Sequence, residues 1–259
     1  MNKRKLILPL IGGVLIVGGV ACTLLTEGLD TAIPFALGLI AVVVGVFMIP
    51  LGLMKPKNKV DVRTLSMAAL FAALCYVGFT YCKIDIPVGM EKTAFHLGNV
   101  FCVRAALFLG GVWGGMAGAV GMTIADLTTA YVTSAPKTFL LKLCIGLIVG
   151  LVAHKIFHIS QDRERKISLP VATALSCIAG MAFNVVADPL VGYFYKMYIL
   201  GVPQQAADLW AKMGAVTTLV NAIIAVVAAT AMMALTRVVT APIFAHRSAA
   251  CWGTPRMYI

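Results

Sequence analysis

Residues 137–158 read KTFLLKLCIGLIVGLVAHKIFH, an apolar run in which Lys142 stands alone among aliphatic side chains. A helix of about 20 residues is long enough to cross the roughly 30 Å hydrocarbon core of a bilayer. The run therefore predicts a transmembrane helix. An ionisable side chain inside such a helix costs about 2.5–3.5 kcal/mol on insertion, so Lys142 is expected to serve a function.

The rest of the chain has the same apolar character. Of its 259 residues, 61% are hydrophobic and only 12% are charged, whereas soluble domains carry about 25% charged residues. This composition excludes a water-soluble domain and predicts an all-α integral membrane protein. Apolar windows of spanning length predict about eight transmembrane helices, at residues 6–26, 31–53, 64–82, 96–110, 112–132, 137–158, 170–196 and 213–236.

These helices divide into an N-terminal pair and a six-helix unit. Lys3, Arg4 and Lys5 before an apolar run resemble the start of a signal peptide. The run is long enough to span the membrane, however, and a second run follows it directly, so we expect a retained transmembrane hairpin. The predicted divisions are the hairpin 1–55, a basic linker 56–63, a six-helix substrate-binding domain 64–240 and a cytoplasmic tail 241–259.

The basic residues give this arrangement an orientation. The chain has 21 lysines and arginines, 10 acidic residues and a net charge of +11. Because Lys and Arg concentrate on the cytoplasmic side, their clusters predict a multi-pass protein of the bacterial cell membrane with both termini in the cytoplasm. Clusters of this kind do not indicate a nucleic-acid partner. Five basic residues are then expected on the external side, namely Lys83, Lys92, Lys137, Lys196 and Lys212.

Polar residues inside the predicted helices indicate a binding pocket. In the predicted orientation they share a level in the outer half of the bilayer, which favours a pocket that opens outward. Two acids and two bases balance there, which suits a neutral or zwitterionic ligand. The predicted substrate-binding residues are Asn99, Arg104, Asp126, Lys142, Asn184, Asp188 and Asn221.

Two alternatives concern the same polar residues. Asp126 with Lys142, and Asp188 with Arg104, could instead form interhelical ion pairs that only fix the packing. The external segments 83–93 and 197–212 are candidate lids over the pocket. Aromatic residues are few, and the candidate stacking partners are Tyr131, Phe183, Tyr193 and Trp113. A small ring is therefore slightly favoured over a large one as the ligand.

Small residues at helical spacing predict close helix packing. Gly110, Gly114 and Gly118 recur every four residues, and the pair Gly110–Gly111 favours a tight turn between two helices. In the third segment, alanines repeat at the same spacing, at positions 68 and 72 and at positions 69 and 73. Within the chain this pattern is equally typical of simple packing.

The sequence lacks the motifs of catalysis and of ATP hydrolysis. It has no GxxxxGK[ST] phosphate loop, so ATP-driven work would fall to a partner. It has no GxSxG or HExxH motif, and its seven cysteines stand singly. His154 and His158 are one helical turn apart, but no third ligand accompanies them. We therefore expect neither an enzyme nor a metal site nor a bound cofactor.

Four short blocks give the chain a resemblance to a known family. They are Phe95–Asn99 (FHLGN), Gly110–Gly115 (GGVWGG), Ala125–Leu127 (ADL) and Ala135–Phe139 (APKTF). Together they resemble the substrate-specific S components of energy-coupling factor vitamin transporters, in the riboflavin-type branch that includes pyridoxine and hydroxymethylpyrimidine carriers. The resemblance covers about residues 62–240 and implies a six-helix bundle.

The family resemblance also implies partners and a mode of action. An S component binds a vitamin from outside and associates with a membrane coupling subunit and an ATPase pair. Ala68 and Ala72 match the Ala-xxx-Ala pattern with which the family contacts that subunit. The helix pair at 6–53 departs from the six-helix pattern. The identity of the vitamin stays open among riboflavin, pyridoxine, hydroxymethylpyrimidine and others.

The main alternative is a stand-alone secondary transporter or channel for a small polar solute. Secondary transporters often contain repeated halves whose interrupted helices meet at the bilayer midplane. The sequence shows no internal repeat, and its predicted polar level lies above the midplane. These features favour the S component.

Overall fold

The fold is described from a computed structural model. The structure describes residues 11, 13–14, 17–18, 62–89, 91–160 and 167–247. The predicted hairpin 1–55 and linker 56–63 lie almost wholly outside these residues, as does most of the predicted tail 241–259. The count of eight transmembrane helices therefore stays a prediction.

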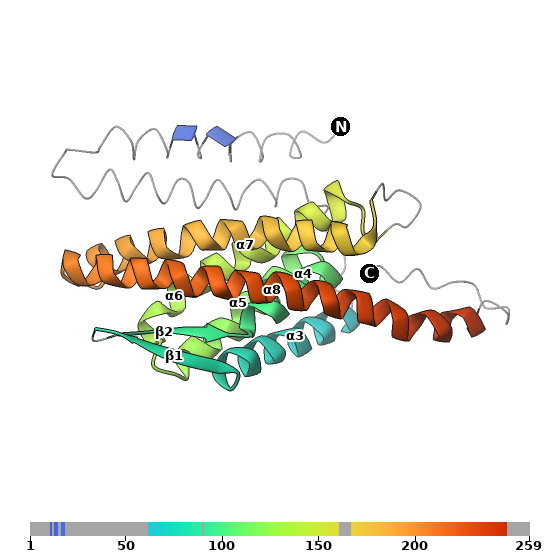
Figure 1. Cartoon of the computed structure of the whole chain (residues 1–259), viewed down its shortest axis with the longest axis horizontal. Coiled ribbons are helices and arrows are strands. Elements are labelled where there is room, and N and C mark those ends of the chain that lie inside the picture. Colours follow the sequence, from blue (N-terminus) through green and yellow to red (C-terminus); the bar gives the residue numbers. More distant parts are fainter. Residues whose placement is uncertain are drawn as a thin grey trace.

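Helices dominate the described residues, as expected (Figure 1). Within these residues four helical segments are long and apolar enough to cross a membrane, namely Val62–Thr80, Val132–Ile156, Leu169–Ile199 and Gln204–Thr236, and Gly98–Leu109 is a shorter apolar helix. The elements are α3 (Val62–Thr80), β1 (Lys83–Val88), β2 (Glu91–His96), α4 (Gly98–Leu109), α5 (Gly111–Leu127), η1 (Val132–Ser134), α6 (Ala135–Leu151), η2 (Val152–Ile156), α7 (Leu169–Phe194), η3 (Tyr195–Ile199) and α8 (Gln204–Arg247).

A β-hairpin replaces the expected external loop at 83–93, so the all-α prediction was wrong there. Strands β1 and β2 pair antiparallel, with Lys83 opposite His96 and Val88 opposite Glu91. Ile84 and Ile86 are β-branched residues at alternate positions, a pattern that favours a strand. Gly89 has a φ of +62°, which a glycine adopts without strain at a tight turn.

The second expected loop, 197–212, is mostly helical. Helix α7 continues into the π-helical turn η3, and α8 already begins at Gln204. Proline cannot donate a backbone hydrogen bond, and Pro203 lies just before α8, where its carbonyl accepts from the N–H groups of Ala206 and Ala207. Only residues 200–203 connect the two helices, so most of the predicted lid belongs to α8. The same helix runs past the predicted end at residue 236 to Arg247.

Glycines allow α5 to pack closely against its neighbours, as the sequence predicted. A Cβ atom placed on Gly114 would lie 2.3 Å from the Ala106 backbone of α4. One on Gly146 of α6 would lie 2.2 Å from the Cα atom of Gly115. Helix α5 therefore touches both helices backbone to backbone. The predicted turn between α4 and α5 is also confirmed, since Gly110 has a φ of 80°.

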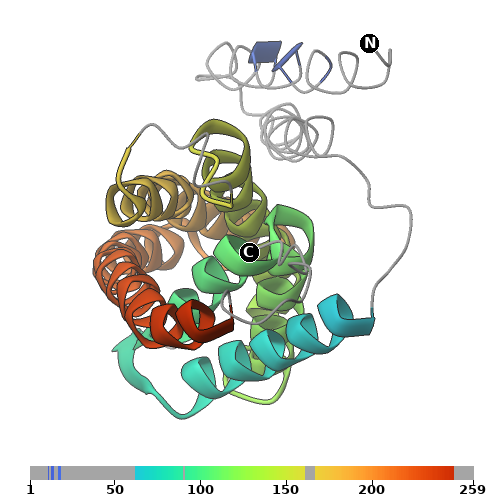
Figure 2. The same cartoon turned by 90° about the vertical axis from the view of Figure 1, so that its right-hand side faces the viewer.

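The bundle has two distinct ends. Helices α7 and α8 lie side by side, and Figure 2 shows them nearly end-on while α3 crosses the bundle obliquely. The hairpin β1–β2 and the connection 200–203 lie at the same end, and α8 extends beyond the other helices at the opposite end (Figure 1). We call the end that holds the hairpin β1–β2 and the connection 200–203 the hairpin end.

Candidate functional site: a polar cavity at the hairpin end

A cavity lies among the helices and the hairpin. The cavity is open on one side, and the space between its lining side chains, together with the solvent at its mouth, amounts to about 580 Å³. The sequence-predicted residues that line it are Asn99, Asp126, Lys142, Asn184, Asp188 and Asn221. The predicted convergence of these polar side chains is therefore confirmed for six of seven residues, whereas their role in binding is a separate question.

Arg104 is the seventh residue, and it does not line the cavity. It follows Asn99 by five residues on α4, which is about 7.5 Å along the helix axis. There its guanidinium donates to the Thr236 hydroxyl and lies 4.8 Å from the centre of the Phe108 ring. The alternative ion pair between Arg104 and Asp188 is therefore not formed.

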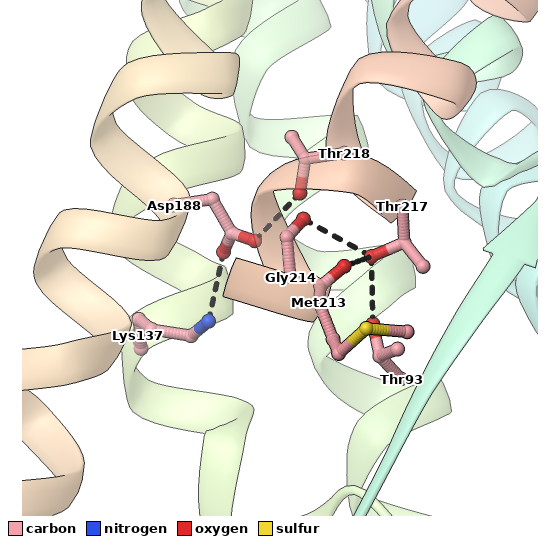
Figure 3. Close-up of polar contacts among 7 residues, drawn as sticks. All are labelled: Thr93, Lys137, Asp188, Met213, Gly214, Thr217 and Thr218. Carbon is pink, nitrogen blue, oxygen red and sulfur yellow. Dashed lines mark hydrogen bonds and ion pairs between the residues drawn. The ribbon is translucent and has the colours of Figure 1, made fainter. Parts of the chain in front are cut away.

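Asp188 instead pairs with Lys137, a lysine that the charge count assigned to the external side. The Nζ atom of Lys137 lies 2.7 Å from one oxygen of the Asp188 carboxylate, and Thr218 donates to the other at 3.0 Å (Figure 3). The sequence predicts a helix from residue 137, and the structure places Lys137 in the first turn of α6, which begins at Ala135. Lys137 is thus a helical residue, and only 5% of its side chain is exposed.

Lys196 was likewise assigned to the external side, at the end of the predicted helix 170–196. It lies in η3, where it is buried, and its ammonium is 4.6 Å from the Trp210 ring. The ammonium of Lys137 is also 4.6 Å from a ring of Trp210. Trp210 belongs to the candidate lid 197–212, which was expected to be a loop. It lies instead in the second turn of α8 and lines the cavity.

Asn221 uses its amide group to hold strand β2. Its side-chain oxygen accepts from the backbone N–H of His96, and its side-chain nitrogen donates to the carbonyl of Ala94, both at 2.9 Å. A hydroxyl contact of 2.9 Å between Thr93 and Thr217 lies beside them (Figure 3). The amide of Asn221 is therefore engaged by the hairpin, which makes it a positioning residue.

Strand β1 is held from the other side by Tyr131. The Tyr131 hydroxyl donates to Asp85 at 2.8 Å, and Lys83 forms an ion pair with the same carboxylate at 3.3 Å. Burial, and then the hydrogen bond to Asp85, raise the pKa of Tyr131, so the phenol stays protonated. Both strands are thus tied to helical segments, and the hairpin forms part of the cavity.

Aromatic rings line the cavity on the hairpin side. Phe79 makes edge-on contacts with His96 at 4.7 Å and with Tyr131 at 5.5 Å, measured between ring centres. Of the four aromatic residues proposed as stacking partners, Tyr131 alone lines the cavity. Trp113 packs instead in a cluster that contains Ala68 and Ala105, away from the cavity.

Several buried polar atoms of the cavity have no hydrogen-bond partner among the described residues. Buried polar groups in native proteins are nearly always paired, so such a concentration in one cavity indicates a site for a ligand. The atoms are His96 Nδ1, Asn99 Oδ1, Asp126 Oδ2, Asn184 Oδ1 and Trp210 Nε1.

Lys142 is the remaining ionisable residue of the cavity. It is 7% exposed, and its ammonium makes no hydrogen bond or ion pair with a residue that the structure describes. The alternative ion pair between Lys142 and Asp126 is therefore not formed. Three lysines, at positions 92, 137 and 142, and two aspartates line the cavity, so the predicted balance of charge shifts by one toward positive.

The alanines of α3 divide between the core and the surface. Ala68 is 7% exposed and packs with Phe71, Ala105 and Ala117. Ala72 is half-buried, and its backbone abuts Gly121 of α5. In contrast, Ala69 and Ala73 are exposed. The two alanine pairs thus have different surroundings, which the sequence spacing alone did not distinguish.

A bundle of apolar helices with a polar cavity among them defines a class of protein, a multi-pass membrane protein with a solute-binding site. Residues 59–237 match the model of a family described as the ECF-type riboflavin transporter, S component, and the chain belongs to this family. Neither a curated protein nor a solved structure matches the chain.

Proposed function

We propose that this chain is the substrate-binding subunit of an energy-coupling factor importer, and that it captures a vitamin or vitamin precursor in the cavity at the hairpin end. The observation that supports the proposal most directly is the group of unpartnered buried polar atoms in that cavity. Burying such atoms without partners costs about 1–3 kcal/mol each. A bound polar ligand would remove that cost.

Ligand capture is tested by purifying the full chain and identifying any retained small molecule by mass spectrometry. We expect the purified chain to retain a compound of the size of a vitamin. After this compound has been removed, calorimetry should show that it binds to the chain again. A chain that retains nothing, and that binds neither riboflavin nor any smaller vitamin, would contradict the proposal.

Energy for uptake is proposed to come from partners, a membrane coupling subunit and an ATPase pair. Membership of the S-component family supports this assignment. In vesicles, the chain alone should bind the ligand without accumulating it, and accumulation should require the partners and ATP. Uptake by the chain alone, insensitive to ATP depletion, would favour the alternative of a stand-alone secondary transporter.

The surface for the coupling subunit is proposed to lie on α3, centred on Ala69 and Ala73. These exposed alanines leave room for close approach of another helix, whereas Ala68 is already packed within the bundle. Ala69→Trp and Ala73→Trp should abolish copurification with the coupling subunit while ligand binding persists. Ala231→Trp, at an exposed position of α8, is the matched control and should still copurify.

A further inference from the structure

One of the unpartnered atoms of the cavity can only donate a hydrogen bond, namely the indole nitrogen Nε1 of Trp210. Trp210 lies in α8, lines the cavity and is 7% exposed. A buried tryptophan N–H usually has a hydrogen-bond partner, yet no residue that the structure describes accepts from this one. The cavity therefore presents a buried donor that a bound molecule can satisfy.

The contacts of the indole show which way its N–H group points. A Cβ atom placed on Gly192 of α7 would lie 2.2 Å from Cζ3 of Trp210 and 2.8 Å from Cη2. A Cβ atom on Gly214, one turn further along α8, would meet the same two atoms at 3.4 and 3.5 Å. Cζ3 lies across the six-membered ring from Cε2, the carbon that is bonded to Nε1. The N–H group therefore points away from Gly192, and its edge of the ring is the one left to face the cavity.

Two lysines hold the indole in this position. The ammonium groups of Lys137 and Lys196 both lie over the ring of Trp210, each 4.6 Å from a ring centre, which is within the range of a cation–π contact. Both lysines are buried, and Lys137 is fixed in turn by its ion pair with Asp188. Because charged groups lie over the ring and a helix backbone abuts one edge, the indole has little freedom to turn its N–H group elsewhere.

Resting on the proposed function, we propose that Trp210 is a ligand-binding residue whose indole N–H donates to an acceptor atom of the captured molecule, and that Gly192 is the residue that positions it. The acceptor can be a carbonyl oxygen, a hydroxyl oxygen or a ring nitrogen, since each has a lone pair. A side chain at position 192 would displace the ring and move the N–H group from its place. The pair Gly192–Trp210 thus determines how tightly and in which orientation the molecule is held.

The test combines ligand binding with an NMR signal from the indole itself. The tryptophan indole nitrogens of the full chain are isotope-labelled, and the signal of Trp210 is assigned by its loss in Trp210→Phe. The probes are riboflavin, pyridoxine and any compound that the purified chain retains. A probe that binds should shift the Trp210 N–H signal and slow its exchange with water. The signal of Trp113, which packs away from the cavity, should not move.

Three variants separate the donor from the packing of the ring. Trp210→Phe keeps an aromatic ring and removes the donor, so calorimetry should show about tenfold weaker binding of the same probe. Gly192→Ala should also weaken binding, because the added methyl group would displace the indole. Gly214→Ala is the matched control, since it adds the same methyl group against the same ring at 3.4 Å, an ordinary contact distance. It should leave the affinity unchanged.

An unmoved Trp210 signal with a probe bound would overturn the inference even if Gly192→Ala fails to fold, while the proposed function would stand. Unchanged affinity in Trp210→Phe would overturn it too, and a lower unfolding temperature of that variant would then show that the ring serves only the packing. A protein that binds none of the probes and retains no compound would contradict the proposed function itself, and the inference with it.

Discussion

At the scale of single residues, the Lys137–Asp188 pair shows how α6 and α7 are joined beside the cavity. Both groups are largely buried, with 5% and 20% of their side chains exposed. Thr218 of α8 completes the coordination of the Asp188 carboxylate. A buried pair of this kind adds little net stability, but the loss of one member leaves an unpaired charge in an apolar region.

Lys137→Met should therefore destabilise the protein by about 3 kcal/mol, the lower end of the range for broken buried pairs, because Asp188 keeps some exposure. The measurement is thermal unfolding in detergent. The double change Lys137→Met with Asp188→Leu should recover much of the loss, because no unpaired charge remains. A double variant less stable than the single one would contradict this account.

Asn221 is the second residue whose effect can be measured on its own. Asn221→Ala removes both hydrogen bonds to β2, so amide hydrogen exchange at His96 should become about tenfold faster. Asn221→Asp keeps the acceptor for the His96 N–H and loses only the donor to Ala94. Slow exchange at His96 in both variants would show that the strand is held by other contacts.

At the scale of elements, the packing of α5 against α6 depends on glycines of both helices. Gly146→Ala should misplace α6 against α5, since the added methyl group would meet the Gly115 backbone at 2.2 Å. We expect a loss of about 1–3 kcal/mol, the usual effect of overpacking, measured as a lower unfolding temperature in detergent. Gly214→Ala is the control, because there the nearest atoms are side-chain atoms at 3.4 Å, and its stability should change little.

The hairpin is the element that hydrophobicity did not predict. A six-residue strand is too short to give a strong periodic signal, and Lys83 and Lys92 made the segment resemble a solvated loop. The hairpin becomes evident only in the tertiary structure, where Asn221 binds strand β2 and Tyr131 binds strand β1. The segment 83–93, a candidate lid in the sequence, is therefore part of a β-hairpin whose residues Lys92 and Thr93 line the cavity.

At the scale of the whole molecule, the orientation in the membrane is the property that charge counting predicts and that labelling can test. Cys82 precedes β1 at the hairpin end and is the one exposed cysteine among the described residues. If this end faces outward, a membrane-impermeant maleimide should label intact cells, and Cys82→Ala should lose that labelling. Labelling of Cys82 only after permeabilisation would reverse the predicted orientation.

Sequence alone predicted a helix in each region where α3 to α8 lie, and the level of the polar residues along these helices. Length and apolarity predict where a helix crosses a bilayer, and the residue count along each helix fixes depth at 1.5 Å per residue. For this reason Asn99, Asp126, Lys142, Asn184, Asp188 and Asn221 could be expected at one level, and all six line the cavity.

The tertiary structure decided which of these residues meet. Asp188 pairs with Lys137 rather than Arg104, and Asn221 holds a strand. The rotation of each helix and the choice of its neighbours depend on how glycine and alanine faces pack together. That packing is a property of several helices at once, so no single apolar run contains it. The depth of a residue can therefore be predicted from the sequence of its own helix, whereas the residues that it contacts depend on how the helices of the bundle pack together.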